Sequence, residues 1–258
     1  MYKSYSASDY KKFLKLPDNY CVDGFVCYGT SHLKTFPIEQ FENSLKMLTL
    51  KYKISKLESE NLHSVKEIKV KGKTFWFTNA YGGAELSELL HWACLFGSKK
   101  NIHLGSCGGL VPNGKQLDLI IPIYSYGEES SAKTYQPDAN NKYYSDKSLS
   151  KSLFKLLSKT HTVHTGPIVT CQATLAETFE GVQEWSNQGY SGVEMESATV
   201  FAVSNHFKVP SAAIVYIVDN LIKQETVLDK GFEDTKIIRR KVTQDMFDAT
   251  VKVLIGGK

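Results

Sequence analysis

The sequence has 258 residues, of which 42% are hydrophobic and 22% are charged, and this balance suits one large α/β domain with a substantial core. The formal charge of +4 comes almost wholly from scattered lysines, because Arg239 and Arg240 are the only arginines. Nucleic-acid-binding proteins concentrate basic residues on one face, so no nucleic-acid partner is expected. No apolar run reaches the roughly eighteen residues of a transmembrane helix, so no membrane partner is expected either.

Five cysteines are present, and none of them stands in Cys-x-x-Cys spacing. An odd number of unpaired-looking cysteines predicts reduced thiols, and argues against both a disulfide framework and a zinc site. The first residues lack the apolar segment of a secretory signal, so a cytoplasmic protein is expected. No metal and no cofactor are expected. Residues 1–19 are polar and lysine-rich and are expected to form an N-terminal extension, with a short helix at 10–16.

Hydrophobic patterning predicts alternating strands and helices along the first half of the chain. Strands are expected at 24–28, 65–71 and 74–78, and helices at 38–52 and 84–96.

The second half continues the alternation. Strands are expected at 117–123, 163–171 and 213–219, helices at 148–158, from 198 onward and at 235–255, and a polar surface segment at 127–146. In the last helix, Ile238, Val242, Met246 and Val251 have helical spacing. This order predicts a single-domain three-layer α/β/α sandwich over residues 1–258, with a central mixed β-sheet and a ligand site at the carboxyl ends of its strands.

The stretch Gly192-Val-Glu-Met-Glu-Ser-Ala-Thr199 places two carboxylates around a methionine where an apolar run meets a helix. Acidic residues at a helix start often serve only to complement the helix dipole. A carboxylate held at such a rigid junction can also accept hydrogen bonds from two neighbouring hydroxyls, and a ribose diol has that geometry.

Three segments in order, 101–110, 193–199 and 213–220, resemble motifs of the nucleoside phosphorylases and nucleosidases. That family includes uridine phosphorylase, the hexameric purine nucleoside phosphorylases and methylthioadenosine/S-adenosylhomocysteine nucleosidase. The similarity extends from about residue 22 to residue 228, and it implies a phosphorylase/hydrolase-like fold. By the same resemblance, a homo-oligomer, either a dimer or a hexamer, is expected.

The resemblance also implies roles for individual residues. The ribose would be bound by Glu196, Met195 and Glu194. Asp219 would protonate N7 of a departing purine. General acid catalysis of this kind typically raises the rate by about 10²–10⁴-fold. The residues expected to form the base pocket are Cys171, Gln172, Thr174 and Asn220.

The site of the attacking group departs from the family pattern. Phosphorylases of this kind hold phosphate with three arginines, but the corresponding regions here contain His32, residues 61–63 and His103. Histidine is a weaker and pH-dependent substitute for a guanidinium. The glutamate that activates water in the nucleosidases is missing too. The residues expected around phosphate or water are Gly29, Thr30, Ser31, His32, His103 and Ser106.

The sequence therefore predicts an enzyme that cleaves the N-glycosidic bond of a purine nucleoside, with inorganic phosphate as co-substrate and acceptor. Two alternatives stay open: a phosphate-independent nucleosidase of the methylthioadenosine type, and a nucleoside-binding protein without catalytic activity.

Overall fold

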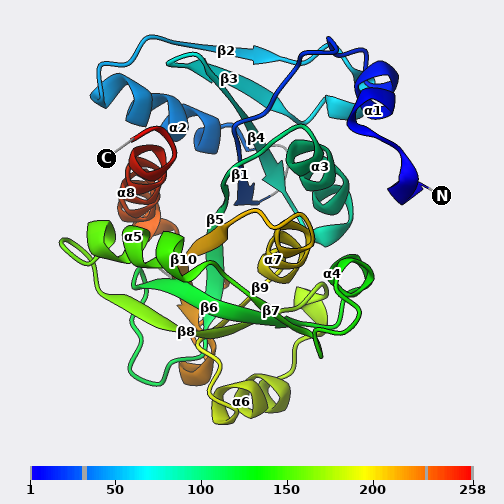
Figure 1. Ribbon diagram of the computed structural model, residues 1–258. Helices are drawn as coiled ribbons and strands as arrows, with labels where there is room; N and C mark the ends of the chain where they lie inside the picture. Colours follow the sequence, from blue (N-terminus) through cyan, green and yellow to red (C-terminus); the bar gives the residue numbers. More distant parts are fainter. Residues whose placement is uncertain (1, 31–33, 230–231, 257–258) are drawn as a thin grey trace.

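The computed structural model of the protein describes residues 2–30, 34–229 and 232–256. Within these ranges, ten strands form one mixed sheet in the order β2-β3-β4-β1-β5-β9-β8-β6-β10, with β7 beside β6 (Figure 1). The strands are β1 (Gly24–Gly29), β2 (Tyr52–Lys56), β3 (Lys66–Val70), β4 (Lys73–Ala80), β5 (Asn101–Gly109), β6 (Leu119–Gly127), β7 (Lys142–Tyr144), β8 (Val163–Thr170), β9 (Gly192–Glu194) and β10 (Ser211–Asn220).

Part of the sheet closes on itself. Strand β10 pairs with β6 on one side and with β5 on the other, so β5, β9, β8, β6 and β10 form a closed ring. The pairs β1–β4, β1–β5, β5–β10 and β6–β8 are parallel, whereas β5–β9 and β6–β10 are antiparallel. Closure removes two exposed edges and brings the ends of β5, β9 and β10 together.

Helices cover both faces of the sheet, which confirms the predicted three-layer α/β/α architecture (Figure 1). One layer contains α2, α5 and α8, and the other contains α1, α3, α4 and α7. The helices are α1 (Ala7–Phe13), α2 (Phe36–Met47), α3 (Gly83–Leu95), α4 (Ser130–Tyr135), α5 (Lys147–Leu157), α6 (Phe179–Asn187), α7 (Ser197–His206) and α8 (Lys236–Ile255).

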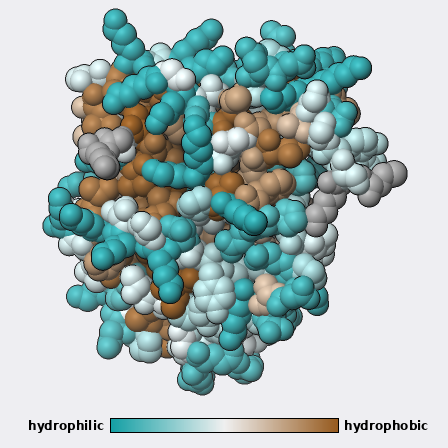
Figure 2. Space-filling model, in the orientation of Figure 1, coloured by the Kyte–Doolittle hydropathy of each residue, from teal (hydrophilic) through white to brown (hydrophobic). Residues whose placement is uncertain are grey.

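Each helical layer packs its own apolar cluster against the sheet. Helix α7 is buried at every position from Ser197 to Ser204, as the largely apolar run from Ala198 to Val203 predicts. Helix α8 turns Val242, Met246 and Val251 inward, whereas Ile238, which shares their helical spacing, is 53% exposed. Hydrophilic side chains dominate the periphery of the face in Figure 2, and hydrophobic residues gather toward its middle and upper part. Among the described residues, no helix is both long and apolar enough to cross a membrane.

The structure corrects two expected elements. The helix predicted to reach residue 52 ends at Met47, Thr49 adopts a positive φ of 53°, and Tyr52 already begins β2. The segment 127–146, expected at the surface, contains α4 and β7, and Tyr143 is fully buried. Periodicity is detected over several residues. It therefore does not resolve the residue at which a helix ends, or a short helix and strand within a polar segment.

The glycine-rich segment after His103 is part of strand β5. Strand β5 runs on to Gly109 because β9 and β10 flank it: Gly108 pairs with Val193, and Cys107 pairs with Ile217. This extension places Ser106 within the sheet, beside the ends of the neighbouring strands.

Candidate active site

A cavity of about 370 Å³ lies at the carboxyl ends of β1, β5 and β10; we call it the central cavity. This edge of an α/β sheet is where ligands commonly bind. The residues that line it and bear on its chemistry are Gly29, Thr30, Lys34, Tyr81, Ser106, Thr174, Glu177, Glu194, Met195, Glu196 and Asp219. Glu196 and Asp219, on which the sequence interpretation depends, therefore line the same cavity.

Glu196 immediately precedes α7 and is only 4% exposed. Its Oε1 accepts a hydrogen bond of 2.7 Å from the backbone amide of Gly82. A Cβ on Gly29 would lie 2.7 Å from its Oε2, so only glycine permits this close approach of β1. Burial raises the pKa of Glu196 to about 7, and Glu194 adds to the rise while His103 opposes it. The carboxyl group is thus fixed in position and titrates near neutrality.

Glu194 caps α7, because its Oε2 accepts hydrogen bonds of 2.9 Å from the amides of both Glu196 and Ser197. Its Oε1 accepts from the hydroxyl of Thr170 at 2.6 Å. The capping explanation therefore applies to Glu194. With both oxygens engaged inside the protein, Glu194 positions the start of the helix, whereas the sequence interpretation had given it a contact with ribose.

His103 lies beneath the two glutamates and is fully buried. Its Nε2 is 3.2 Å from Glu194 Oε2 and 3.8 Å from Glu196 Oε2, and its Nδ1 is 3.5 Å from Cys27 Sγ. Burial disfavours the imidazolium, but Cys27 and Glu194 outweigh that penalty and hold the pKa of His103 well above its usual range. Burial likewise opposes ionisation of Glu194, yet His103 and the donors around it lower its pKa. The two residues form a buried ion pair.

His103, Glu194 and Glu196 also form the one group of three side chains in the described part of the chain whose metal-ligating atoms lie within 4.8 Å of one another. Glu194 already accepts bonds from Thr170 and two backbone amides, and one oxygen of Glu196 is bound to Gly82. We therefore assign the group to an ion pair.

Asp219 reaches the central cavity through an irregularity in β10. The pairing with β5 shifts between Ile217 and Asp219, which leaves Val218 as an extra residue. Successive residues of a regular strand point to opposite faces, but Val218 and Asp219 both line this cavity. Burial raises the pKa of Asp219 to about 6, and the acidic side chains of Asp229 and Glu225 contribute. The group is therefore partly protonated close to neutral pH.

Two charged residues of the cavity were not singled out from the sequence. Glu177 follows a single turn of 3₁₀ helix at Thr174–Ala176; burial raises its pKa to about 7, and Asp219 adds to the rise. Lys34 precedes α2 and lines the cavity from the β1 side. Both stand in polar segments without periodicity, so only the folded chain reveals their position.

Met195 is held in place by the loop after β8. Gln172 donates a hydrogen bond of 2.6 Å to the carbonyl oxygen of Met195 and accepts one of 3.1 Å from the amide of Gly83. The hydroxyl of Thr174 lies 3.5 Å from the Met195 sulfur. Thr174 and Met195 both line the central cavity, whereas Gln172 acts as a brace behind it.

Other expected residues are not brought to the central cavity. Cys171 and Gln172 line a separate cavity near α6. Asn220 is fully buried, and its side-chain amide donates to the carbonyl oxygen of Gly114 at 2.8 Å, which fixes the end of β10. Ser31 and His32 lie outside the described residues. Thr30 and Ser106 do line the central cavity.

A family model matches about two thirds of the chain. The family model described as the phosphorylase superfamily matches residues 79–253, and the chain belongs to that superfamily.

Relatives with phosphorylase names are similar to parts of the chain. A guanosine phosphorylase of Halorubrum lacusprofundi is 26% identical over 121 residues, 47% of this chain and 50% of that protein. A DeoD-type purine nucleoside phosphorylase of Buchnera aphidicola is 26% identical over 141 residues, 53% of this chain and 58% of that protein. The chain thus spans little more than half the length of these two relatives. A DeoD-type 2 enzyme of Vibrio vulnificus is 22% identical over 212 residues, 76% of this chain and 86% of that protein.

A solved structure supports the fold over nearly the whole chain. The uridine phosphorylase of Vibrio fischeri, crystallised with 6-hydroxy-1-naphthoic acid, superposes with a TM-score of 0.70 at 18% identity, covering 93% of each chain. The shared architecture is that of a nucleoside phosphorylase.

Proposed function

We propose that this protein is a pentosyltransferase that cleaves the N-glycosidic bond of a purine nucleoside and transfers the ribosyl group to phosphate. The observation that carries the proposal is the convergence of Glu196 and Asp219 on one cavity. Burial raises the pKa of both carboxyls, to about 7 for Glu196 and to about 6 for Asp219, and perturbed carboxyl pKa values are common at catalytic sites.

Glu196 would bind the sugar. Its Oε2 faces Gly29, and in the ionised form it would accept hydrogen bonds from the ribose 2′- and 3′-hydroxyls. Such charge-assisted bonds contribute about 1.5–3 kcal/mol each. Met195, braced by Gln172, would contact the apolar face of the ribose.

Asp219 would act on the leaving group. Its raised pKa keeps a proton on part of the population near neutral pH, and that proton would pass to N7 of the purine as the bond to C1′ breaks. A purine without this protonation leaves as an anion, which is why a positioned acid accelerates the step.

Phosphate is favoured over water as the acceptor because Lys34 and Ser106, a cation and a hydroxyl donor, line the cavity. Glu177 interacts with Asp219 and so lies at the end from which the base departs. A base that activates water belongs on the opposite face of the sugar, so Glu177 does not favour hydrolysis.

The test is release of a free base from inosine, guanosine, adenosine or methylthioadenosine, with and without phosphate. We expect phosphate-dependent release from at least one of them. Glu196→Ala should weaken both nucleoside binding and turnover, whereas Asp219→Asn should mainly lower turnover. Phosphate-independent release would favour the nucleosidase, and binding without release in either buffer would favour a nucleoside-binding protein. One domain over residues 1–258, assembly into a dimer or hexamer, and a cytoplasmic location stay predictions.

A further inference from the structure

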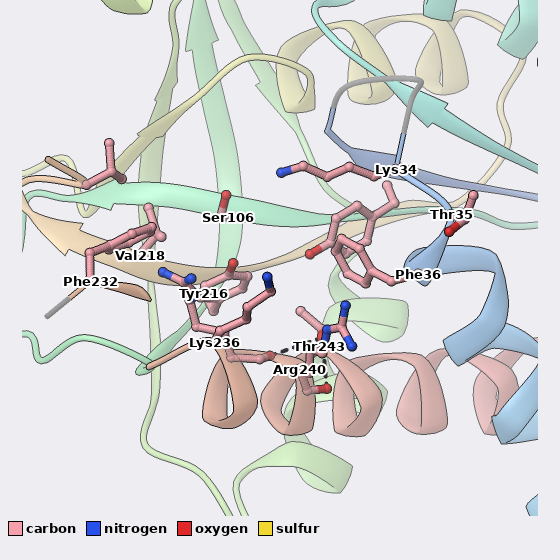
Figure 3. Close-up of a pocket in the computed structure, with 13 residues that line it drawn as sticks. Lys34, Thr35, Phe36, Ser106, Tyr216, Val218, Phe232, Lys236, Arg240 and Thr243 are labelled. Atoms are coloured by element: carbon pink, nitrogen blue, oxygen red, sulfur yellow. Dashed lines mark hydrogen bonds between the residues drawn. The ribbon is translucent and has the colours of Figure 1, made fainter. Parts of the chain in front are cut away.

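A second cavity, of about 650 Å³, lies beside the central cavity on the α2 and α8 side; we call it the basic cavity (Figure 3). Lys34, Ser106, Val218 and Val227 line both cavities, so the two are neighbours that share a wall. A group bound in one would therefore lie next to a ligand in the other.

The lining of the basic cavity is strongly cationic. Lys34, Lys236, Arg239 and Arg240 contribute to it, and none of its described lining residues is acidic. The only two arginines of the chain are both among them, in the first turns of α8. The positive end of the α8 dipole adds to this potential. Figure 3 shows the side chains of Lys34 and Lys236 pointing into the space between Ser106 and Phe36.

Arg239 carries a donor that the described part of the chain does not satisfy. Its Nη1 is buried and has no hydrogen-bond partner there, and its guanidinium carbon lies 3.8 Å from the centre of the Phe232 ring. A guanidinium cannot lose its charge, and a buried unpaired donor is costly. Phe232 packs against the guanidinium, and Arg239 is part of the wall of the basic cavity.

Neutral hydroxyl donors complete the lining. Burial raises the pKa of both Tyr28 and Tyr216, and Arg239 opposes the rise in each case. The two phenols therefore stay protonated and can donate hydrogen bonds. Ser106 and Thr243 add two further hydroxyls. Arginine, lysine and hydroxyl donors around one space are the ligand set that recognises a phosphate group.

We propose that the basic cavity binds a phosphate group, with Arg239 as its principal ligand and Lys34 at the boundary with the central cavity. This inference rests on the proposed function and names residues for the site of its phosphate acceptor. The segments at β1 and β5 lack arginine and lysine there, and α8 and the segment before α2 supply the cations. The phosphate has two chemical sources, free orthophosphate or a phosphoryl group on the sugar of the substrate.

With orthophosphate, the balance of the reaction is complete. An oxygen of hydrogen phosphate forms the bond to C1′, and the bond from C1′ to the purine nitrogen breaks with its electron pair going to the base. Asp219 supplies the proton that the base takes up, and the proton released by hydrogen phosphate restores Asp219. The products are ribose 1-phosphate and the free base.

The experiment measures orthophosphate binding to the full chain by calorimetry, without nucleoside. We expect Arg239→Gln to weaken binding at least about tenfold, because a charge-assisted bond is lost. Lys241→Gln is the matched control, since it removes one charge from an exposed position on α8 outside the basic cavity. Arg239→Lys keeps the positive charge but loses the two parallel N–H donors of the guanidinium, so it should give an intermediate affinity. It keeps the test informative if Arg239→Gln does not fold.

Two kinetic arms distinguish the sources. If orthophosphate is the ligand, inosine cleavage requires it, and Arg239→Gln raises the KM for phosphate while the KM for inosine changes little. If the substrate carries the phosphate, inosine 5′-monophosphate is cleaved better than inosine in phosphate-free buffer, and Arg239→Gln removes that preference.

Equal phosphate affinity in wild type, Arg239→Gln and Lys241→Gln would overturn the inference, even if base release is observed. Loss of phosphate binding in Arg239→Gln together with no base release from any nucleoside or nucleotide would support the cavity and refute the proposed function.

Discussion

The imidazole Nε2 of His103 lies 3.2 Å from Oε2 of Glu194, and neither side chain is more than 1% exposed. This pair joins β5, which contains His103, to Glu194, which caps α7. It places a buried cation beneath Glu196. The cation attracts Glu196 while Glu194 repels it, so the charge on the cavity carboxylate depends on the pair.

Replacing His103 should therefore destabilise the fold. In His103→Gln, Glu194 loses its cation but stays buried, and we expect the free energy of unfolding to fall by about 3–5 kcal/mol. The raised pKa of His103 gives stability that is fully present below 6.5, and the lowered pKa of Glu194 gives stability that is fully present above 4.5. Urea denaturation between these two pH values should show the largest loss.

The matched control is His164→Gln. His164 Nε2 lies 2.9 Å from Asp118 Oδ2, but the two side chains are 26% and 13% exposed. Water screens this pair, so we expect a loss of about 1 kcal/mol or less. Similar losses in the two variants would contradict a buried ion pair at His103.

Gly29→Ala should disturb the cavity more than the fold. The new Cβ would lie 2.7 Å from Glu196 Oε2 and 3.1 Å from Cε1 of His103, so Glu196 must move. Because Glu196 would grip the ribose, we expect the KM for nucleoside to rise about tenfold or more. Steady-state kinetics and a urea curve on the same sample separate this effect from unfolding.

Gly181→Ala serves as its control. Gly181 lies in α6, and a Cβ there would meet only the Thr178 hydroxyl at an ordinary 3.4 Å. The substitution should leave KM unchanged and stabilise the protein by about 0.5–1 kcal/mol, because alanine favours a helix. An unchanged KM in Gly29→Ala would remove the steric argument for Glu196.

Local sequence patterns predicted most of the fold because its elements are periodic. The largely apolar start of α7 and the alternation in β3 and β4 were identified from single windows of residues. The end of α2 was misplaced because Leu48 and Leu50 continue the apolar pattern while Thr49 takes a positive φ. Helix α6 was missed although Phe179, Val182 and Trp185 have helical spacing, because polar residues and Gly181 stand among them.

The candidate site was predictable where a short motif carries it. Glu196 and Asp219 stand in the two motifs that resemble the family, and both line the central cavity. Glu177 and the cations of the basic cavity could not be foreseen, because nothing in the sequence around Lys34 or Arg239 indicates that α8 packs beside α2. These cations come together only because α2 and α8, some 200 residues apart in the sequence, pack side by side. The hydrogen bond from the side chain of Gln40 to the carbonyl oxygen of Arg240 is one contact between these helices.

Glu177 and Asp219 are two acids at one end of the central cavity, and mutation should tell them apart. Asp219→Asn should lower kcat on a purine nucleoside by about 10²–10⁴, the usual worth of a general acid. Glu177→Gln should lower it less than about tenfold, because Glu177 only neighbours the acid. A larger loss in Glu177→Gln than in Asp219→Asn would transfer the role of acid to Glu177.

The pH dependence of kcat/KM tests both carboxyls at once. Glu196 must be ionised to accept the ribose hydroxyls, and its pKa is about 7, so its active fraction falls as the pH drops. Asp219 must be protonated to serve as the acid, and its pKa is about 6, so its active fraction falls as the pH rises. The product of the two fractions is a bell with its maximum between these values, where less than about a tenth of the enzyme has both groups in the required form, and kcat/KM should fall below about pH 6 and above about pH 7. In Asp219→Asn the alkaline limb should disappear, leaving a low rate that rises to a plateau above pH 7. A wild-type profile that stays level from pH 7 upward would mean that no proton on Asp219 takes part in the reaction.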